Sequence, residues 1–267
     1  MTEDSPLLID RVGPVVHATF NRPARRNALN MELVEAFDAL LADIREDKAV
    51  RVLVIGGAGG HFCAGLDLTD AATPMTPEEK LAAQRERNRR TAARFAAIAS
   101  LPQVVIAKVS GSAYAGGLGF VCTADIAIAD ATARFAAPEV RRGLVPAQIL
   151  PWMARRMGRS TATRMVLQAN VLDAGAALSA GLVHEVAPDA AALDALLQTI
   201  LSDILQGAPG ALAETKGLLA ALGQAVPEGY AEAGAAAFAR AASGEAAEGI
   251  AAFKEKRSPA WARPLST

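Results

Sequence analysis

The sequence is poor in the residues that build disulfide frameworks and metal centres. Its 267 residues include two cysteines, Cys63 and Cys122, and three scattered histidines. Two cysteines make neither a disulfide framework nor a zinc cluster, and their scarcity is typical of a reducing compartment. We therefore expect no metal site, and a chain of this length can bury a large core without such staples.

Long hydrophobic runs and an excess of charge are also missing. No stretch of about 18 apolar residues occurs, so we expect no membrane-spanning helix. The 27 Lys and Arg residues nearly balance the 28 Asp and Glu residues, which argues against nucleic acid or an anionic membrane as a partner. The first residues are acidic and have no cationic segment before an apolar one, so we expect no secretory signal and a cytoplasmic protein.

What the sequence does contain is an alternation of short apolar runs and helical patterns. The apolar runs predict strands at residues 7–10, 14–20, 51–55, 103–109, 125–129 and 134–136. Apolar residues at helical spacing predict helices over residues 30–48 and 77–100. Further on, the pattern predicts short helices at residues 149–157, 160–169 and 173–180, a last strand at 182–186, and only helices from residue 189 onward. This order is typical of an α/β fold with parallel strands.

Two glycine-rich loops follow apolar strands, at residues 56–65 and 110–119. The first fits no nucleotide motif, because Phe62 stands where the dinucleotide motif needs Gly or Ala, and Leu66 and Asp67 stand where the phosphate loop needs Lys and Ser or Thr. Loops after neighbouring parallel strands meet at one edge of the sheet, where α/β proteins bind ligands. Two backbone N–H groups can then converge on one oxygen, as an oxyanion site requires. The alternative is that the glycines only permit tight strand-to-helix turns.

Five stretches of the chain carry a resemblance to a known family. They read NRPARRNALN (21–30), HFCAGLDL (61–68), AKVSGSAYAGGLGFVCTADI (107–126), ARFAAPEVRRGLVP (133–146) and EGIAAFKEKRSPAW (248–261). In order and spacing they resemble the crotonase superfamily, the enoyl-CoA hydratases and isomerases. The resemblance implies an α/β spiral of repeated ββα units with the acyl-CoA site in residues 1–200, and a helical trimerisation region in residues 201–267. It also implies a homotrimer or homohexamer.

The resemblance assigns roles in the binding of a CoA thioester. It implies that the backbone N–H groups of Leu66 and Gly116 bind the thioester oxygen, which gains negative charge as an enolate forms. CoA is then part of the substrate, and no separate cofactor is expected. The implied contacts to CoA or substrate are Arg25, Asn27, Ala28, Ala64, Asp67, Leu68, Phe253 and Lys256, the last two often reaching a neighbouring subunit. Tyr114 lines the pocket or packs in the core.

The carboxylates depart from the pattern of typical hydratases in this family, which use two glutamates. Glu139, after Pro138, matches one of them, but Gly119 stands where the other is expected. A single glutamate can act as base and then as acid. We therefore expect hydration of a 2-enoyl-CoA by Glu139, with 3-enoyl/2-enoyl-CoA isomerisation as the alternative. A non-catalytic protein of the same fold that binds a CoA thioester or a partner is a further alternative, since a glutamate at a helix start also stabilises the helix.

The residues after Glu139 bear on the substrate. The segment LVPAQI (144–149) resembles hydratases that act on branched glutaconyl-CoA substrates. Arg141 or Arg142 is a candidate contact for a substrate carboxylate, and the alternative is a solvated surface arginine.

Overall fold

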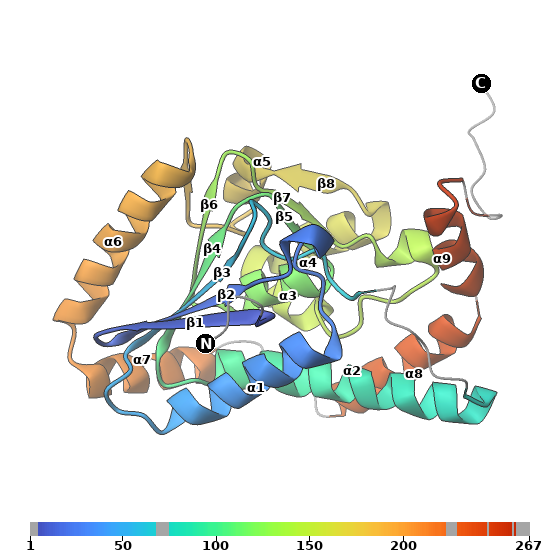
Figure 1. Cartoon of the computed structure of the whole chain (residues 1–267), viewed down its shortest axis with the longest axis horizontal. Helices are drawn as coiled ribbons and strands as arrows, with labels where there is room; N and C mark the ends of the chain where they lie inside the picture. Colours follow the sequence, from blue (N-terminus) through green and yellow to red (C-terminus); the bar gives the residue numbers. More distant parts are fainter. Residues whose placement is uncertain (1–4, 68–74, 223–228, 245, 258, 260–267) are drawn as a thin grey trace.

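The computed structural model describes the chain apart from residues 1–4, 68–74, 223–228, 245, 258 and 260–267. A six-stranded sheet lies at its centre in the order β1-β2-β3-β4-β6-β9 (Figure 1). Its strands are β1 (Leu7–Val12), β2 (Val15–Phe20), β3 (Val52–Gly57), β4 (Val104–Val109), β6 (Ile126–Asp130) and β9 (Glu185–Ala187). β1 pairs antiparallel with β2, and each other neighbouring pair is parallel. The predicted α/β fold with parallel strands is confirmed.

A second sheet of three short strands lies beside the end of the first. It contains β5 (Ser112–Tyr114), β7 (Arg134–Ala136) and β8 (Val171–Asp173). The chain passes from β4 to β5 and from β6 to β7 within a few residues, and a helical turn follows each time. The glycine-rich loop at 110–119 lies on this path, and the loop at 56–65, which follows β3, joins it through the bridge between Cys63 and Ala113.

Helices cover both faces of the large sheet. They are α1 (Met31–Arg45), α2 (Pro77–Ala99), α3 (Gly116–Thr123), α4 (Leu150–Gln168), α5 (Ala174–Ser179), α6 (Ala190–Gln206), α7 (Pro209–Leu222), α8 (Tyr230–Ser243) and α9 (Ala246–Lys254), with 3-10 turns η1 (Pro23–Arg25) and η2 (Glu139–Arg142). The apolar stripes of α1 and α3 bury one face of the sheet, and Leu193, Leu197 and Leu201 of α6 bury the other. Strands that are apolar on both sides need cover on both sides, which explains this layering.

The boundaries of some elements differ from those that the sequence predicts. The two helices predicted at 149–157 and 160–169 form the single element α4, interrupted at Gly158 by a positive φ of 78°. The last strand begins at Glu185 rather than at residue 182. The helix α6 runs through residue 200, the predicted boundary between the core and the helical region.

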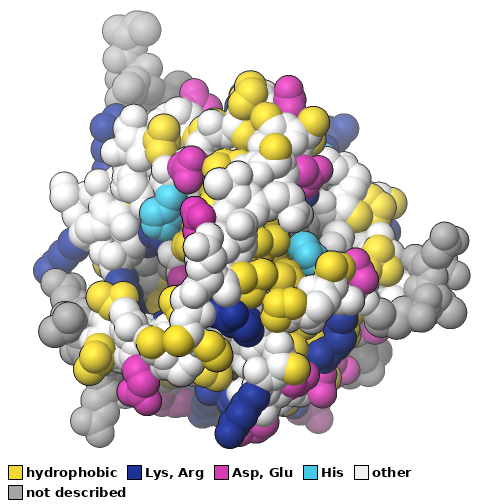
Figure 2. Space-filling model, turned by 90° about the vertical axis from the view of Figure 1, so that its left-hand side faces the viewer, with side chains coloured by type: hydrophobic (Ala, Val, Ile, Leu, Met, Phe, Trp, Pro, Cys, Tyr) yellow, Lys and Arg dark blue, Asp and Glu magenta, His cyan; other side chains and the backbone are white. Residues whose placement is uncertain are grey.

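The helices α8 and α9, near the end of the chain, pack against α2 and η2. α8 packs along α2, and α9 packs against η2 (Figure 1). The ion pair between Arg89 Nε and Glu232 Oε2, 2.8 Å apart, joins α2 to α8. On another face, both basic and acidic side chains lie around an apolar centre (Figure 2). In the described part of the chain, no helix is long and apolar enough to cross a bilayer.

Candidate active site

Backbone hydrogen bonds hold the two glycine-rich loops against each other. Cys63 N–H donates to Ser112 O at 2.9 Å, and Tyr114 N–H donates to Cys63 O at 2.9 Å. A Cβ placed on Gly65 would lie 2.7 Å from Ala115 Cβ and 3.5 Å from Gly116 N. Gly65 also has a positive φ of 87°, which favours glycine. The loops therefore approach as closely as they do because residue 65 has no side chain.

This approach brings two unused backbone donors to one place. Gly116 is the first residue of α3, so its N–H has no partner within the helix. Leu66 lies between two residues that are hydrogen-bonded to Leu29. The Gly65 carbonyl oxygen accepts from Leu29 N–H at 2.7 Å, and Asp67 N–H donates to Leu29 O at 3.0 Å. Within the described chain, neither the Leu66 nor the Gly116 N–H donates to a protein acceptor, and both residues line one cavity. Two free N–H groups beside each other are what binding a carbonyl oxygen requires.

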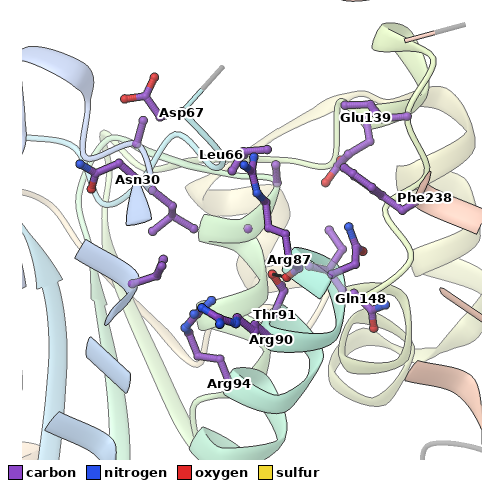
Figure 3. Close-up of a pocket in the computed structure, with 18 of the residues that line it drawn as sticks. Asn30, Leu66, Asp67, Arg87, Arg90, Thr91, Arg94, Glu139, Gln148 and Phe238 are labelled. Atoms are coloured by element: carbon purple, nitrogen blue, oxygen red, sulfur yellow. Dashed lines mark hydrogen bonds between the residues drawn. The ribbon is translucent and has the colours of Figure 1, made fainter. Parts of the chain in front are cut away.

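The cavity has a volume of about 580 Å³ and is walled by elements from most of the chain (Figure 3). Leu66 and Gly116 lie on one side, α2 forms a second wall, and Phe238 and Phe253 come from α8 and α9. The site residues implied by the family resemblance that line the cavity are Arg25, Ala28, Ala64, Leu66, Asp67, Gly116, Glu139 and Phe253. Asn27, Tyr114 and Lys256 do not line it, and Leu68 lies outside the described residues. Phe253 reaches the cavity of its own chain.

Glu139 presents a carboxyl group without an ion-pair partner on the described chain to this cavity (Figure 3). It is the first residue of η2, its side chain is largely buried, and the residue is 9% exposed. Its Oε2 atom has no hydrogen-bond partner among the described residues. Burial raises the pKa of Glu139 to about 7, although its own backbone N–H and the nearby Arg142 act in the opposite direction. A carboxyl group with a pKa near 7 can both accept and donate a proton at neutral pH.

The position of the missing second glutamate is filled by an aromatic ring. A Cβ on Gly119 would lie 2.7 Å from Phe95 Cε2 and 2.9 Å from Ile149 Cγ2, and closer still to Phe95 Cζ. Phe95 is 1% exposed and packs edge-on against Phe120, with ring centroids 5.6 Å apart. Neither Gly119 nor Phe95 lines the cavity. The other carboxylates that line the cavity each form an ion pair with an arginine. Among the described residues, Glu139 is the carboxylate of the cavity without such a partner.

Two buried polar side chains fix the first loop from behind. Asn27, fully buried with a φ of 56°, donates from Nδ2 to Ala58 O at 2.9 Å and to His61 O at 2.6 Å. Asp67, next to Leu66, accepts from Arg22 Nη2 at 2.9 Å, and Arg22 also donates to Ala28 O. Both residues are implied contacts to CoA, and Asp67 lines the cavity. Both also support the loop that carries the Leu66 N–H.

Replacing Asp67 with asparagine is expected to lower the free energy of unfolding by about 1.5–3 kcal/mol, because the mostly buried Arg22 would lose a charged partner. The matched control is Asp43→Asn, which removes a partner of the exposed Arg11 and should cost less than about 1 kcal/mol. Urea unfolding of both variants measures the difference. Equal losses would show that the pair at Asp67 is no more than a surface ion pair.

The other reactive side chains form no competing site. Burial raises the pKa of the Cys63 and Cys122 thiols to about 12, so both stay protonated. His61 Nδ1 lies 3.0 Å from Ser112 Oγ, but no carboxylate contacts that imidazole among the described residues. The described residues also hold no group of three or more His, Cys, Asp or Glu side chains that could bind a metal ion.

The polar residues that α2 contributes to the cavity were not predicted from the sequence. They are Glu86, Arg87, Asn88, Arg90, Thr91 and Arg94. A signal was present, because a helix beside a buried core is expected to be apolar on one face, whereas the segment QRERNRR (84–90) puts charge on every face. That signal indicates a polar environment on one side of α2 without saying what the environment is.

Comparisons with known proteins identify the family. Residues 11–264 match the family model described as enoyl-CoA hydratase/isomerase. The chain is 34% identical over 257 residues to the 2,3-dehydroadipyl-CoA hydratase of Escherichia coli, covering 96% of this chain and 98% of that protein. Among solved structures it is similar to an enoyl-CoA hydratase from Mycobacterium avium, with a TM-score of 0.83, 35% identity, and coverage of 97% and 100%. Pseudomonas aeruginosa AtuE has a TM-score of 0.77 and 39% identity, again with coverage of 97% and 100%.

Proposed function

The chain belongs to the enoyl-CoA hydratase/isomerase family, the crotonase superfamily, and on that premise we propose that it adds water to the double bond of a 2-enoyl-CoA thioester. The observation that carries the proposal is the position of Glu139. Its buried carboxyl group, whose Oε2 atom has no partner among the described residues, faces the cavity into which Leu66 and Gly116 present their free N–H groups. The name of the E. coli relative, a hydratase, supports the same reaction.

In the proposed reaction the thioester oxygen lies between the N–H groups of Leu66 and Gly116. The Glu139 carboxylate takes a proton from a water molecule as the water oxygen bonds to C3 of the acyl chain. The electron pair of the double bond moves toward the thioester oxygen, which becomes an enolate stabilised by the two donors. The protonated Glu139 then returns its proton to C2, so that one water is added and the carboxylate is restored.

A second candidate function rests on the ring of Phe95. Because that ring fills the space beside Gly119, the described site offers one acid/base group. One such group suffices to remove a proton from C2 of a 3-enoyl-CoA and to deliver it to C4, which shifts the double bond without adding water. Isomerisation is therefore the alternative to hydration.

Turnover of two thioesters separates the two reactions. The purified protein is incubated with crotonyl-CoA and, separately, with 3-hexenoyl-CoA, and the products are separated and their masses measured. Hydration predicts that crotonyl-CoA gains one water, because Glu139 alone can take the proton from water and deliver it to C2. A shifted double bond in 3-hexenoyl-CoA with no mass gain in either reaction would make the protein an isomerase and overturn the hydratase proposal.

We extend the proposal to the remaining contacts and to the assembly. Arg25, Ala28 and Ala64 line the cavity and are proposed to contact CoA, together with Phe253. We also propose a cytoplasmic homotrimer or homohexamer, as the family resemblance implies. Light scattering tests the assembly, and a mass equal to that of one chain would contradict it.

A further inference from the structure

Most charges around the cavity are neutralised within the protein. Arg94 makes two hydrogen bonds to Asp38, at 2.6 and 2.7 Å. On the same helix, Arg90 pairs with Glu86 at 3.3 Å. Below the first loop, Asp67 is paired with Arg22. These pairs need no charged ligand.

Arg87 is the arginine of α2 that lines the cavity without such a partner on the described chain, and it is exposed. Its guanidinium group has no hydrogen-bond acceptor and no ion-pair partner in the described part of the chain, whereas both arginines that follow it, Arg89 and Arg90, have acidic partners. Its side chain extends from α2 across the cavity toward Leu66 (Figure 3). The neighbouring Asn88 also lines the cavity, is buried, and has an amide group without a described partner. The wall formed by α2 thus presents unused donors beside the position of the thioester.

The two arginines that the sequence suggested for a carboxylate contact are placed differently. Arg141 is exposed, does not line the cavity, and donates to Gln168 O at 3.0 Å. Arg142 lines the cavity, but its guanidinium lies 4.4 Å from the centre of the Phe253 ring and beside Glu139. A cation stacked on an aromatic face already has a favourable contact. Arg87 has no such contact.

A hydrocarbon acyl chain would lie against this guanidinium without pairing with it. A carboxylate would accept two parallel N–H···O bonds from the planar fork, the geometry in which arginine binds carboxylates most strongly. We propose that the substrate is an enoyl-CoA whose acyl chain ends in a carboxylate, and that Arg87 binds this carboxylate and sets the specificity. The substrate class rests on the proposed function, but the contact itself can be measured without turnover.

Binding of two saturated thioesters tests the contact, because neither can react. Adipyl-CoA and hexanoyl-CoA have the same chain length and differ in the terminal carboxylate. Calorimetry is expected to show tighter binding of adipyl-CoA, by up to about 10-fold, because Arg87 is exposed and its pairing with a carboxylate is partly screened by solvent. Arg87→Met should remove this preference and leave the affinity for hexanoyl-CoA within about 3-fold. The control Arg89→Met changes an arginine on the same helix that does not line the cavity and should keep the preference.

Three results would overturn the inference. Equal affinity of the wild-type protein for both thioesters would mean that no carboxylate is recognised. If Arg87→Met lowered the affinity for adipyl-CoA and for hexanoyl-CoA equally, Arg87 would bind a phosphate of CoA, which both ligands share. A preference that survives Arg87→Met but disappears in Arg142→Met would assign the carboxylate to Arg142.

Turnover tests the proposed function separately from the contact. The matched unsaturated pair is 2-hexenedioyl-CoA and 2-hexenoyl-CoA, and kcat/KM should favour the first by the same factor as binding. If adipyl-CoA binds through Arg87 and neither unsaturated thioester gains water, the proposed hydration fails while the carboxylate contact stands. If both gain water equally fast, hydration stands and the inferred specificity fails.

Discussion

Replacing Glu139 with glutamine is expected to reduce turnover by about 10²–10⁴-fold while leaving CoA-thioester binding intact, because the amide keeps the shape of the side chain and cannot exchange a proton. For hydration the carboxylate must take a proton from water, so kcat/KM of the wild-type protein should rise with pH through about 7, the raised pKa of Glu139. Steady-state rates over pH 5 to 9 measure both effects. A variant with near wild-type activity would show that another group moves the proton.

The same substitution should make the protein more stable at alkaline pH. Burial raises the pKa of Glu139 from 4.5 to about 7, so the folded protein favours the protonated carboxyl group. At a pH below the value of 4.5 the group is protonated in both states and carries no penalty. As the pH rises toward 7 the unfolded chain ionises more readily than the folded one, and the folded state loses up to about 3 kcal/mol. Glutamine does not ionise, so Glu139→Gln escapes this loss.

Urea unfolding at pH 5 and pH 8 measures this effect. Relative to the wild-type protein, the free energy of unfolding of Glu139→Gln should be higher at pH 8 than at pH 5, by up to about 3 kcal/mol. The control Glu46→Gln removes an exposed carboxylate and accounts for the general effect of one fewer negative charge. If both variants respond to pH equally, the buried position of Glu139 has no influence on its ionisation.

Those parts of the molecule that depend on local patterns could be predicted from the sequence. The apolar run of β3 and the helical spacing in α1 each identify their element, because burial of one or both faces leaves a period in the sequence. The α1 start also follows from its cap, since the Asn30 side chain accepts from Leu33 N–H. The positions of the glycine-rich loops follow from the strands before them.

Features that depend on contacts between distant residues could not be predicted. The strand β8 has three residues and exists because it pairs with β7. The side chain of Arg94 pairs with Asp38, 56 residues earlier, and nothing in either helix alone indicates that partner. The sequence likewise does not show that Arg87 reaches the cavity and has no ion-pair partner in the described part of the chain. Sequence reasoning identified Gly119 as a departure, but only the packing shows that Phe95 occupies the space.

Gly119→Glu is expected to destabilise the protein rather than to supply a second catalytic carboxylate. The new Cβ would meet the ring of Phe95 and the side chain of Ile149 at distances below 3.0 Å. Overpacking of this kind costs about 1–3 kcal/mol, and a carboxylate among apolar side chains adds a further penalty. Urea unfolding measures the loss, and the rate of water addition should not rise. The smaller change Gly119→Ala should already lower stability, since the clash begins at Cβ.

Removing the ring tests whether Phe95 is what excludes the second carboxylate. Phe95→Ala alone should cost about 3–5 kcal/mol because it opens a cavity in the core. In Gly119→Glu/Phe95→Ala the new side chain enters that space, so the double variant should be more stable than the sum of the single losses predicts, by more than about 0.5 kcal/mol. Gly119→Gln/Phe95→Ala controls for volume, and faster hydration by the glutamate variant alone would come from its charge. If Gly119→Glu by itself folds with wild-type stability and hydrates faster, the ring yields readily and the one-carboxylate site does not depend on Phe95.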